Sequence, residues 1–215
     1  MKTKYMKKQI LFIAIILGLM TLTCSSDDTN HEEEPKGNIM KLSDVVSNTA
    51  ITELKENGME LYEGNTPPKI TGIAELTPMQ YDYTNTDYLG FGLGTENDGF
   101  RIQFSDQSSG NQSIKVKFID YYLSNTELKS TFITGSDNKF TVCFILRKFG
   151  GPSAIWSFDY VYFISGIIDG TNIRNMKMAT VGLKEKTPNQ YNLSVEGEIQ
   201  IYSDADGTST LMQPL

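Results

Sequence analysis

Leu193-Ser-Val-Glu-Gly-Glu-Ile-Gln-Ile201 is the stretch that decides the fold class. Apolar residues and one glycine alternate with polar residues along its whole length. Such alternation places apolar side chains on one face of a strand and polar ones on the other, which is typical of a half-buried antiparallel strand. Ile114-Lys-Val-Lys-Phe118 repeats the pattern earlier in the chain. The two segments predict a β-rich domain.

Six further segments rich in β-branched and aromatic residues surround these two. Turn-forming dipeptides such as Asp98-Gly99, Asp137-Asn138 and Asp169-Gly170 separate most of them. The intervals carry no helical pattern of the kind that connects parallel strands. The sequence therefore predicts an all-β antiparallel meander. Its eight strands are expected at residues 69–83, 99–105, 114–118, 125–134, 139–149, 155–167, 171–185 and 193–201.

A meander leaves two sheet edges open unless it closes on itself. Closure into a barrel removes both edges, so the leading prediction is an eight-stranded antiparallel barrel. A two-sheet β-sandwich has the same number of strands and stays as the alternative.

One short helix is expected before the strands. Apolar residues recur at helical spacing over 42–57, Ser43 is the expected N-cap, and Gly58 is the expected stop. Pro67 and Pro68 then exclude a helix interior and a central strand.

The amino terminus has the pattern of an export signal. A basic stretch over residues 1–8 precedes 13 apolar residues, 10–22, which are too few for a transmembrane helix of about 20. Thr21-Leu-Thr-Cys24 at its end resembles a lipobox, although Thr23 departs from the usual small residue. The resemblance implies a lipid anchor on Cys24; ordinary cleavage with Cys24 incidental is the alternative. We expect a signal peptide over 1–23, a flexible acidic tether over 24–40 and one β-barrel domain over 41–215.

Ser25-Ser-Asp-Asp28, directly after the cysteine, resembles the start of Bacteroidetes lipoproteins. That resemblance implies a lipid-anchored protein on the outer face of the outer membrane, with a periplasm-facing protein as the alternative. A short helix followed by eight up-and-down strands also resembles the lipocalin (calycin) architecture. Gly64-Asn-Thr-Pro-Pro-Lys-Ile-Thr-Gly72 is similar to a segment of uncharacterised Bacteroidetes lipoproteins with a lipocalin-like domain, but Ile73 and Ala74 replace the aromatic residue expected there.

Charge and histidine content exclude several functions. The formal charge of −7 becomes −7 − 4 = −11 without residues 1–23, which hold four lysines and no acids. Nucleic acid is a poor partner for such a chain, because its phosphates need cations. The single histidine, His31, lies in the tether, so the domain lacks a histidine base and the usual zinc ligands. We expect no catalytic residues, no metal site and no cofactor. Cys143 is expected to be a buried small hydrophobe without a disulfide.

Three acidic patterns have alternative interpretations. Glu196 and Glu198 share one face of the predicted last strand and could serve a hydrolase that uses carboxylates alone, although solvated side chains explain them better. Asp159 interrupts an aromatic strand, where we expect it to be exposed on the outer face; a hydrogen-bonded position in the wall is the alternative. Ser203-Asp-Ala-Asp-Gly207 is interpreted as a turn, because a calcium loop would need more acidic residues around it.

The aromatic strand Ile155-Trp-Ser-Phe-Asp-Tyr-Val-Tyr-Phe-Ile164 is the leading candidate for binding. Aromatic side chains stack on apolar or sugar ligands, but they also fill small barrels completely. The leading prediction is non-enzymatic binding of a small hydrophobic or amphipathic ligand. The alternatives are a surface glycan- or protein-binding module with an exposed aromatic patch, and the hydrolase. The candidate ligand-binding residues are Phe144, Trp156, Phe158, Tyr160 and Tyr162.

Overall fold

The computed structural model describes residues 40–86, 92–119, 126–150, 156–183 and 196–213. The predicted signal peptide, Cys24, His31 and almost all of the predicted tether lie outside these ranges. The described part of the chain is all-β with one short α-helix, as the sequence predicts. None of its helices has the length and apolarity needed to cross a membrane.

The helical segment is shorter than predicted and is capped elsewhere. A 3-10 turn, η1 (Leu42–Asp44), precedes the helix α2 (Asn48–Glu56). Ser47, and not Ser43, is the N-cap of α2, because its hydroxyl accepts a hydrogen bond from the Ala50 amide at 3.2 Å. Gly58 adopts a φ of +90° just past the helix, a conformation that glycine tolerates, so the predicted stop is confirmed.

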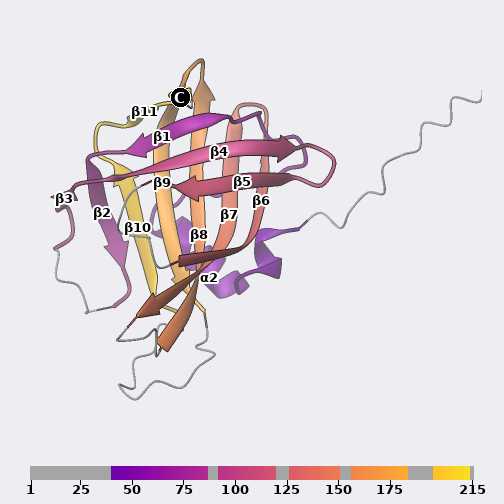
Figure 1. Ribbon diagram of the computed structural model, residues 1–215. Helices are drawn as coiled ribbons and strands as arrows, with labels where there is room; N and C mark the ends of the chain where they lie inside the picture. Colours follow the sequence, from indigo (N-terminus) through magenta and orange to yellow (C-terminus); the bar gives the residue numbers. More distant parts are fainter. Residues whose placement is uncertain (1–39, 87–91, 120–125, 151–155, 184–195, 214–215) are drawn as a thin grey trace, which may run out of the picture. The chain divides into compact units, whose positions relative to one another are not determined.

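Most strands belong to one large antiparallel sheet, whose order is β3-β2-β10-β9-β8-β7-β6, with β11 paired to β9 (Figure 1). Neighbours in sequence pair from β6 to β9, as in a meander. The early strand β2, however, lies between β3 and the late strand β10. The strands are β2 (Met79–Thr84), β3 (Glu96–Asn97), β6 (Thr126–Ser136), β7 (Lys139–Gly150), β8 (Trp156–Asp169), β9 (Asn172–Gly182), β10 (Ile199–Asp204) and β11 (Thr208–Thr210).

A second sheet of three strands runs across the large one at a steep angle (Figure 1). Its order is β1-β4-β5, with β1 (Gly72–Leu76), β4 (Phe100–Ser108) and β5 (Ser113–Phe118). Alternate residues of these strands, such as Ile102 and Phe104, are fully buried against the large sheet. The facing sides of the two sheets thus form the main core, to which the large sheet contributes Phe140, Phe144 and Ile164.

No ladder among the described strands joins the two sheets, so the predicted closed eight-stranded barrel is not confirmed. The sheets meet through isolated hydrogen bonds at their edges instead, among them a reciprocal backbone pair between Ile73 of β1 and Met212, just past β11, at 2.7 and 2.9 Å. The Thr131 hydroxyl of β6 donates to the Ile114 carbonyl of β5 at 2.5 Å, and the Glu75 amide of β1 donates to the Ser209 hydroxyl of β11 at 2.9 Å. The hydrogen bonding is therefore that of two packed antiparallel sheets.

Two predicted strands have different limits in the structure. Residues 69–83 do not form one strand: β1 and β2 are separated at Thr77 and Pro78, since proline has no amide hydrogen for a ladder. In 193–201, residues 193–195 lie outside the described ranges, Glu196 and Gly197 form a turn, and β10 begins only at Ile199. Gly197 has a φ of +78°, which suits a turn rather than a strand.

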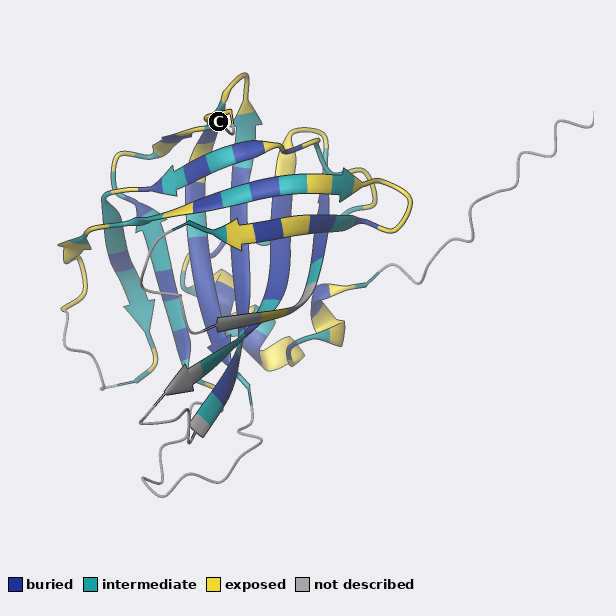
Figure 2. Ribbon diagram, in the orientation of Figure 1, coloured by how far each residue is buried: buried dark blue, intermediate teal, exposed yellow. Residues whose placement is uncertain are grey.

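The large sheet is covered on its other face as well. Leu42, Ala50 and Leu54 of the helical segment pack there against alternate residues of β7 to β10, including Cys143 and Phe163. Figure 2 shows the middle strands of the large sheet as buried along much of their length. Cys143 is fully buried and free, as predicted, and its burial raises the pKa of the thiol.

Candidate ligand-binding cavity

A partly open cavity of about 500 Å³ lies between the two sheets. Its wall combines the inner face of the large sheet with the ends of β4 and β5 and the turn before β4. A volume of this size is typical of pockets for drug-sized molecules. The lining residues are Met79, Tyr81, Asn97, Asp98, Gly99, Phe100, Phe118, Lys148, Tyr162, Met178, Thr180, Gln200 and Tyr202.

Aromatic rings from both sheets build one side of the cavity. Phe118 lies with its ring centroid 5.5 Å from that of Phe100 and 6.0 Å from that of Tyr162. Phe144 stacks on Tyr162 with centroids 5.2 Å apart and planes at 12°, because the two residues are direct neighbours on β7 and β8. The rings offer faces and edges on which a planar or apolar ligand can pack.

Tyr81 and Tyr202 form the other side, on β2 and β10. Their rings make an edge-to-face contact with centroids 4.9 Å apart. The Tyr202 hydroxyl donates to the Gln200 side-chain oxygen at 2.5 Å. Burial raises the pKa of Tyr202, and the charges of neighbouring tyrosines add to the effect. Both phenols are therefore neutral hydrogen-bonding groups at physiological pH.

Two hydroxyls that belong to the cavity wall have no hydrogen-bond partner in the described part of the chain. They are Thr180 Oγ1 and Tyr81 Oη, on residues that are only 4% and 2% exposed. Burial raises the pKa of Tyr81; the hydroxyls of Thr84 and Tyr202 act in the opposite direction without making hydrogen bonds of normal geometry. A buried hydroxyl without a partner costs about 1–3 kcal/mol. Neither oxygen is open to the cavity in this conformation, because both are buried from solvent, so a ligand would have to displace a neighbouring side chain to pair with them.

Lys148 is the one basic residue among the described lining residues. Its ammonium lies 4.6 Å from the ring centroid of Tyr160 and 5.5 Å from that of Tyr162. Asp98 is the one lining carboxylate and is exposed. Glu198 is not among the described lining residues, but its carboxylate accepts from the side-chain amide of Gln200 at 2.5 Å and from the Tyr160 hydroxyl at 3.5 Å. The cavity thus combines an apolar lining with a few placed polar groups.

The five predicted binding residues have different positions relative to the cavity. Tyr162 lines it, and Phe144 lies directly behind Tyr162 in the core. Tyr160 contacts Lys148 but is not a lining residue, and Phe158 is buried away from the lining. The side chain of Trp156 lies outside the described part of the structure.

Sequence reasoning missed most of the cavity wall, including Tyr81, Phe118, Thr180 and Tyr202. Alternation along each strand could have predicted whether each of these residues lies on the apolar or the polar face of its strand. It could not show that β2, β5, β9 and β10 converge, because β2 pairs with β10 across more than 100 residues of sequence. The missing signal is strand pairing.

The predicted positions of the acidic residues need correction. Asp159 is not exposed: it is 5% exposed and makes a two-pronged ion pair with Arg147 of the neighbouring strand, at 2.7 and 2.9 Å. Two parallel hydrogen bonds offset the desolvation of the carboxylate. Glu196 and Glu198 do not share a strand face, because Glu196 lies in a turn before β10. In the segment 203–207, Ser203 and Asp204 end β10, and residues 205–207 form the predicted turn to β11.

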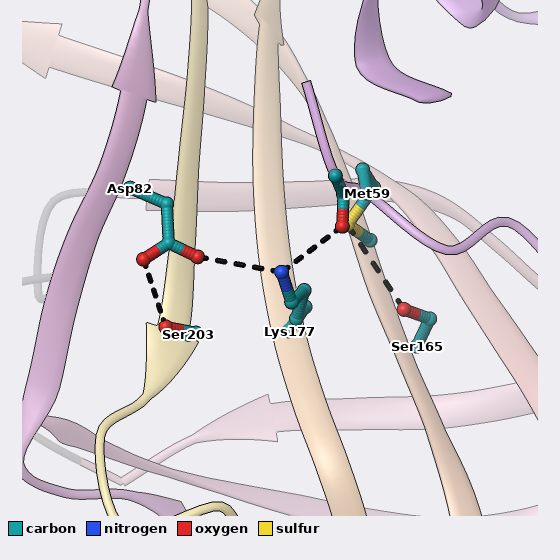
Figure 3. Close-up of polar contacts among 6 residues, drawn as sticks. Met59, Asp82, Ser165, Lys177 and Ser203 are labelled. Carbon is teal, nitrogen blue, oxygen red and sulfur yellow. Dashed lines mark hydrogen bonds and ion pairs between the residues drawn. The ribbon is translucent and has the colours of Figure 1, made fainter. Parts of the chain in front are cut away.

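A polar cluster on the helix-covered face joins three strands to the end of α2 (Figure 3). The Lys177 ammonium on β9 donates to the Gly58 carbonyl at 3.0 Å and lies 3.5 Å from Asp82 of β2. The Ser203 hydroxyl of β10 donates to the other oxygen of Asp82 at 2.9 Å. Next to the cluster, Ser165 donates weakly to the Met59 sulfur at 4.0 Å. These contacts hold the helix end on the sheet.

Within the described ranges, no group of three or more histidine, cysteine, aspartate or glutamate side chains could hold a metal ion. No protein-family model matches the chain, and no curated protein or solved structure matches it significantly.

Proposed function

We propose that this chain is a non-enzymatic binding protein that holds a small amphipathic molecule in the cavity between its two sheets. The observation that carries the proposal is a partly open cavity of about 500 Å³ whose largely aromatic and apolar lining includes the side chains of Lys148 and Gln200. An apolar wall provides affinity, and a few polar groups fix the orientation of the ligand. In this proposal the sheets act as the walls of a lipocalin-like domain.

We further propose that the protein is exported and anchored to the outer membrane through a lipid on Cys24, with its domain on the cell surface. The support is the sequence alone: a basic start, a short apolar run and a cysteine directly after it. Metabolic labelling with a clickable fatty acid should mark the wild-type chain and leave Cys24→Ala unlabelled. Equal labelling of both would contradict the anchor, and resistance of the protein to protease on intact cells would favour the periplasmic face.

The other candidate functions receive less support from the described residues. An exposed aromatic patch would suit a glycan- or protein-binding surface, but the exposed large hydrophobic residues are Leu93, Leu128 and Met212, none of them aromatic. A hydrolase that uses two carboxylates needs both at one cleft, whereas Asp98 is the one carboxylate among the described lining residues.

Native mass spectrometry of the full chain, purified from its host, tests the proposed function. We expect a co-purifying small molecule on the wild type. Thr180→Phe places a ring in the cavity and should abolish the adduct. Thr210→Phe makes the same change at an exposed position of β11 and should keep it. An adduct that survives Thr180→Phe would show that the molecule binds elsewhere, and bare wild-type protein across several growth conditions would count against the proposal.

A further inference from the structure

We propose that the cavity selects amphipathic molecules with an anionic head group, and that Lys148 is the residue that recognises this group. The inference rests on the proposed function and adds the chemical class of the ligand. Two observations support it: the position of the Lys148 ammonium and the absence of a counter-ion among the described residues.

The Lys148 ammonium lies against the rings of two tyrosines at the cavity wall. The distances of 4.6 and 5.5 Å to the centroids of Tyr160 and Tyr162 are within the range of cation–π attraction. These contacts hold the charge at the cavity, of which Tyr162 is itself a lining residue. A ligand that packs on the Tyr162 ring therefore lies next to a fixed positive charge.

That charge has no partner of opposite sign in the described structure. The ion pairs found there involve other cations, and Lys148 approaches no described carboxylate within 4.0 Å. Asp98 is exposed to solvent, and the Glu198 carboxylate, which accepts from the Gln200 amide and the Tyr160 hydroxyl, forms no ion pair with Lys148. Lys148 is partly buried, and a partly buried cation is stabilised by a partner of opposite sign. An anion from the ligand would supply the missing pair.

The rest of the lining is consistent with the same ligand class, because Lys148 is the one basic residue among the described lining residues and Asp98 the one carboxylate. A cationic head group would instead meet the Lys148 ammonium. The apolar part of the ligand would pack against the rings of Phe118 and Tyr162, which lie 6.0 Å apart by centroids.

Three naphthyl probes with different head groups test the inference: 1-naphthylacetate, 2-(1-naphthyl)ethanol and 2-(1-naphthyl)ethylammonium. Each is bound to the full chain in lipid nanodiscs by equilibrium dialysis, with empty nanodiscs as the reference. We expect the wild type to bind the anion about tenfold more tightly than the alcohol, as a charge-assisted hydrogen bond predicts, and the ammonium most weakly. Lys148→Met should remove the preference for the anion while the affinity for the alcohol changes less than threefold.

Lys139→Met is the matched control. Lys139 is on the same strand and also lies over a tyrosine ring, 5.4 Å from the centroid of Tyr62, but it does not line the cavity. It should keep the wild-type preference. Equal binding of anion and alcohol by the wild type, tighter binding of the ammonium, or an unchanged preference in a folded Lys148→Met protein would overturn the inference and leave the proposed function standing. Failure of all three probes to bind would overturn both.

Discussion

At the scale of single residues, Thr180 tests the cost of a buried hydroxyl without a partner. Thr180→Val keeps the shape of the side chain and removes this hydroxyl. We expect the free energy of unfolding to rise by about 1 kcal/mol in the ligand-free protein, and the affinity for 1-naphthylacetate to change little, because the oxygen is not open to the cavity. Urea denaturation and dialysis measure the two effects. A variant that is less stable than the wild type would show that the hydroxyl has a partner in solution.

Asp204 predicts a pH dependence of stability. It is 6% exposed, neither carboxylate oxygen has a hydrogen bond of normal geometry, and burial, followed by the charge of Asp206, raises its pKa to about 7. The unfolded value is near 3.9, so the folded chain binds more protons between these two values. The contribution of Asp204 to stability is therefore largest at acidic pH and falls as the pH rises from about 4 through 7.

Asp204→Asn removes the titrating group and tests this dependence. The variant should be more stable than the wild type at pH 8.5 by about 1–3 kcal/mol and differ little at pH 4. Asp137→Asn, in an exposed turn, is the control and should shift stability equally at both values. A pH profile of unfolding that is the same for Asp204→Asn and the wild type would contradict the burial of the charged form.

The sequence predicted the burial of a residue correctly where its neighbours along the chain determine it. It failed where burial depends on a partner from another strand. The apolar neighbours of Cys143 were enough to predict its burial. The exposure of Asp159 was predicted wrongly, because its partner Arg147 is known only once the register of β7 and β8 is known. The missed hydroxyl of Thr180 is of the same kind, since no local feature marks a residue as part of a wall built by several strands.

At the scale of elements, the link from α2 to the sheet depends on Lys177. Lys177→Met removes the donor to the Gly58 carbonyl, which is an exposed contact, and the partly buried ion pair with Asp82. We expect a loss of about 1–2 kcal/mol in the free energy of unfolding. Faster hydrogen exchange of the α2 amides than of the β7 and β8 amides should accompany it. Lys115→Met breaks a fully exposed pair with Asp106 and should change stability much less than Lys177→Met does. Equal losses would mean that Lys177 does not hold the helix end.

The ends of the strands depend on single glycine and proline residues more than on hydrophobic alternation. The predicted hairpin from β7 to β8 was found, because two long apolar runs dominate it. The predicted strand over 193–201 extended through Gly197, whose backbone conformation ends the alternation before β10. The predicted strand over 69–83 ignored Pro78, although proline confines a strand to an edge or to its first residue.

At the scale of the whole domain, the all-β class followed from alternation, but the arrangement of two sheets did not. The pairing of β2 with β10 and the crossing of β1, β4 and β5 over the large sheet are long-range choices. A single sequence shows which strand faces are apolar, but it does not show which of these faces pack against each other. For that reason the barrel and the sandwich stayed open alternatives, and the cavity between the sheets could be expected only in general terms.

Phe118 connects the two sheets directly above the cavity, and its removal tests that arrangement. Its ring contacts Phe100 of its own sheet and Phe144 and Tyr162 of the large sheet, at centroid distances of 5.5 to 6.0 Å. Phe118→Ala should lower the free energy of unfolding by about 2–4 kcal/mol and weaken binding of all three naphthyl probes to a similar degree, because the lost ring is neutral. Phe118→Leu keeps most of the volume and should cost less than about 1.5 kcal/mol.

The comparison of these two variants with Lys148→Met distinguishes the wall of the cavity from its recognition group. Loss of the Phe118 ring should reduce the affinity for all three probes without changing their order of affinity. Loss of the Lys148 ammonium should change that order, with little effect on the affinity for the neutral alcohol. If Phe118→Ala kept both its stability and its affinities, the small sheet would not close over the cavity in solution. The ring contacts that join the sheets would then contribute nothing to folding or to binding.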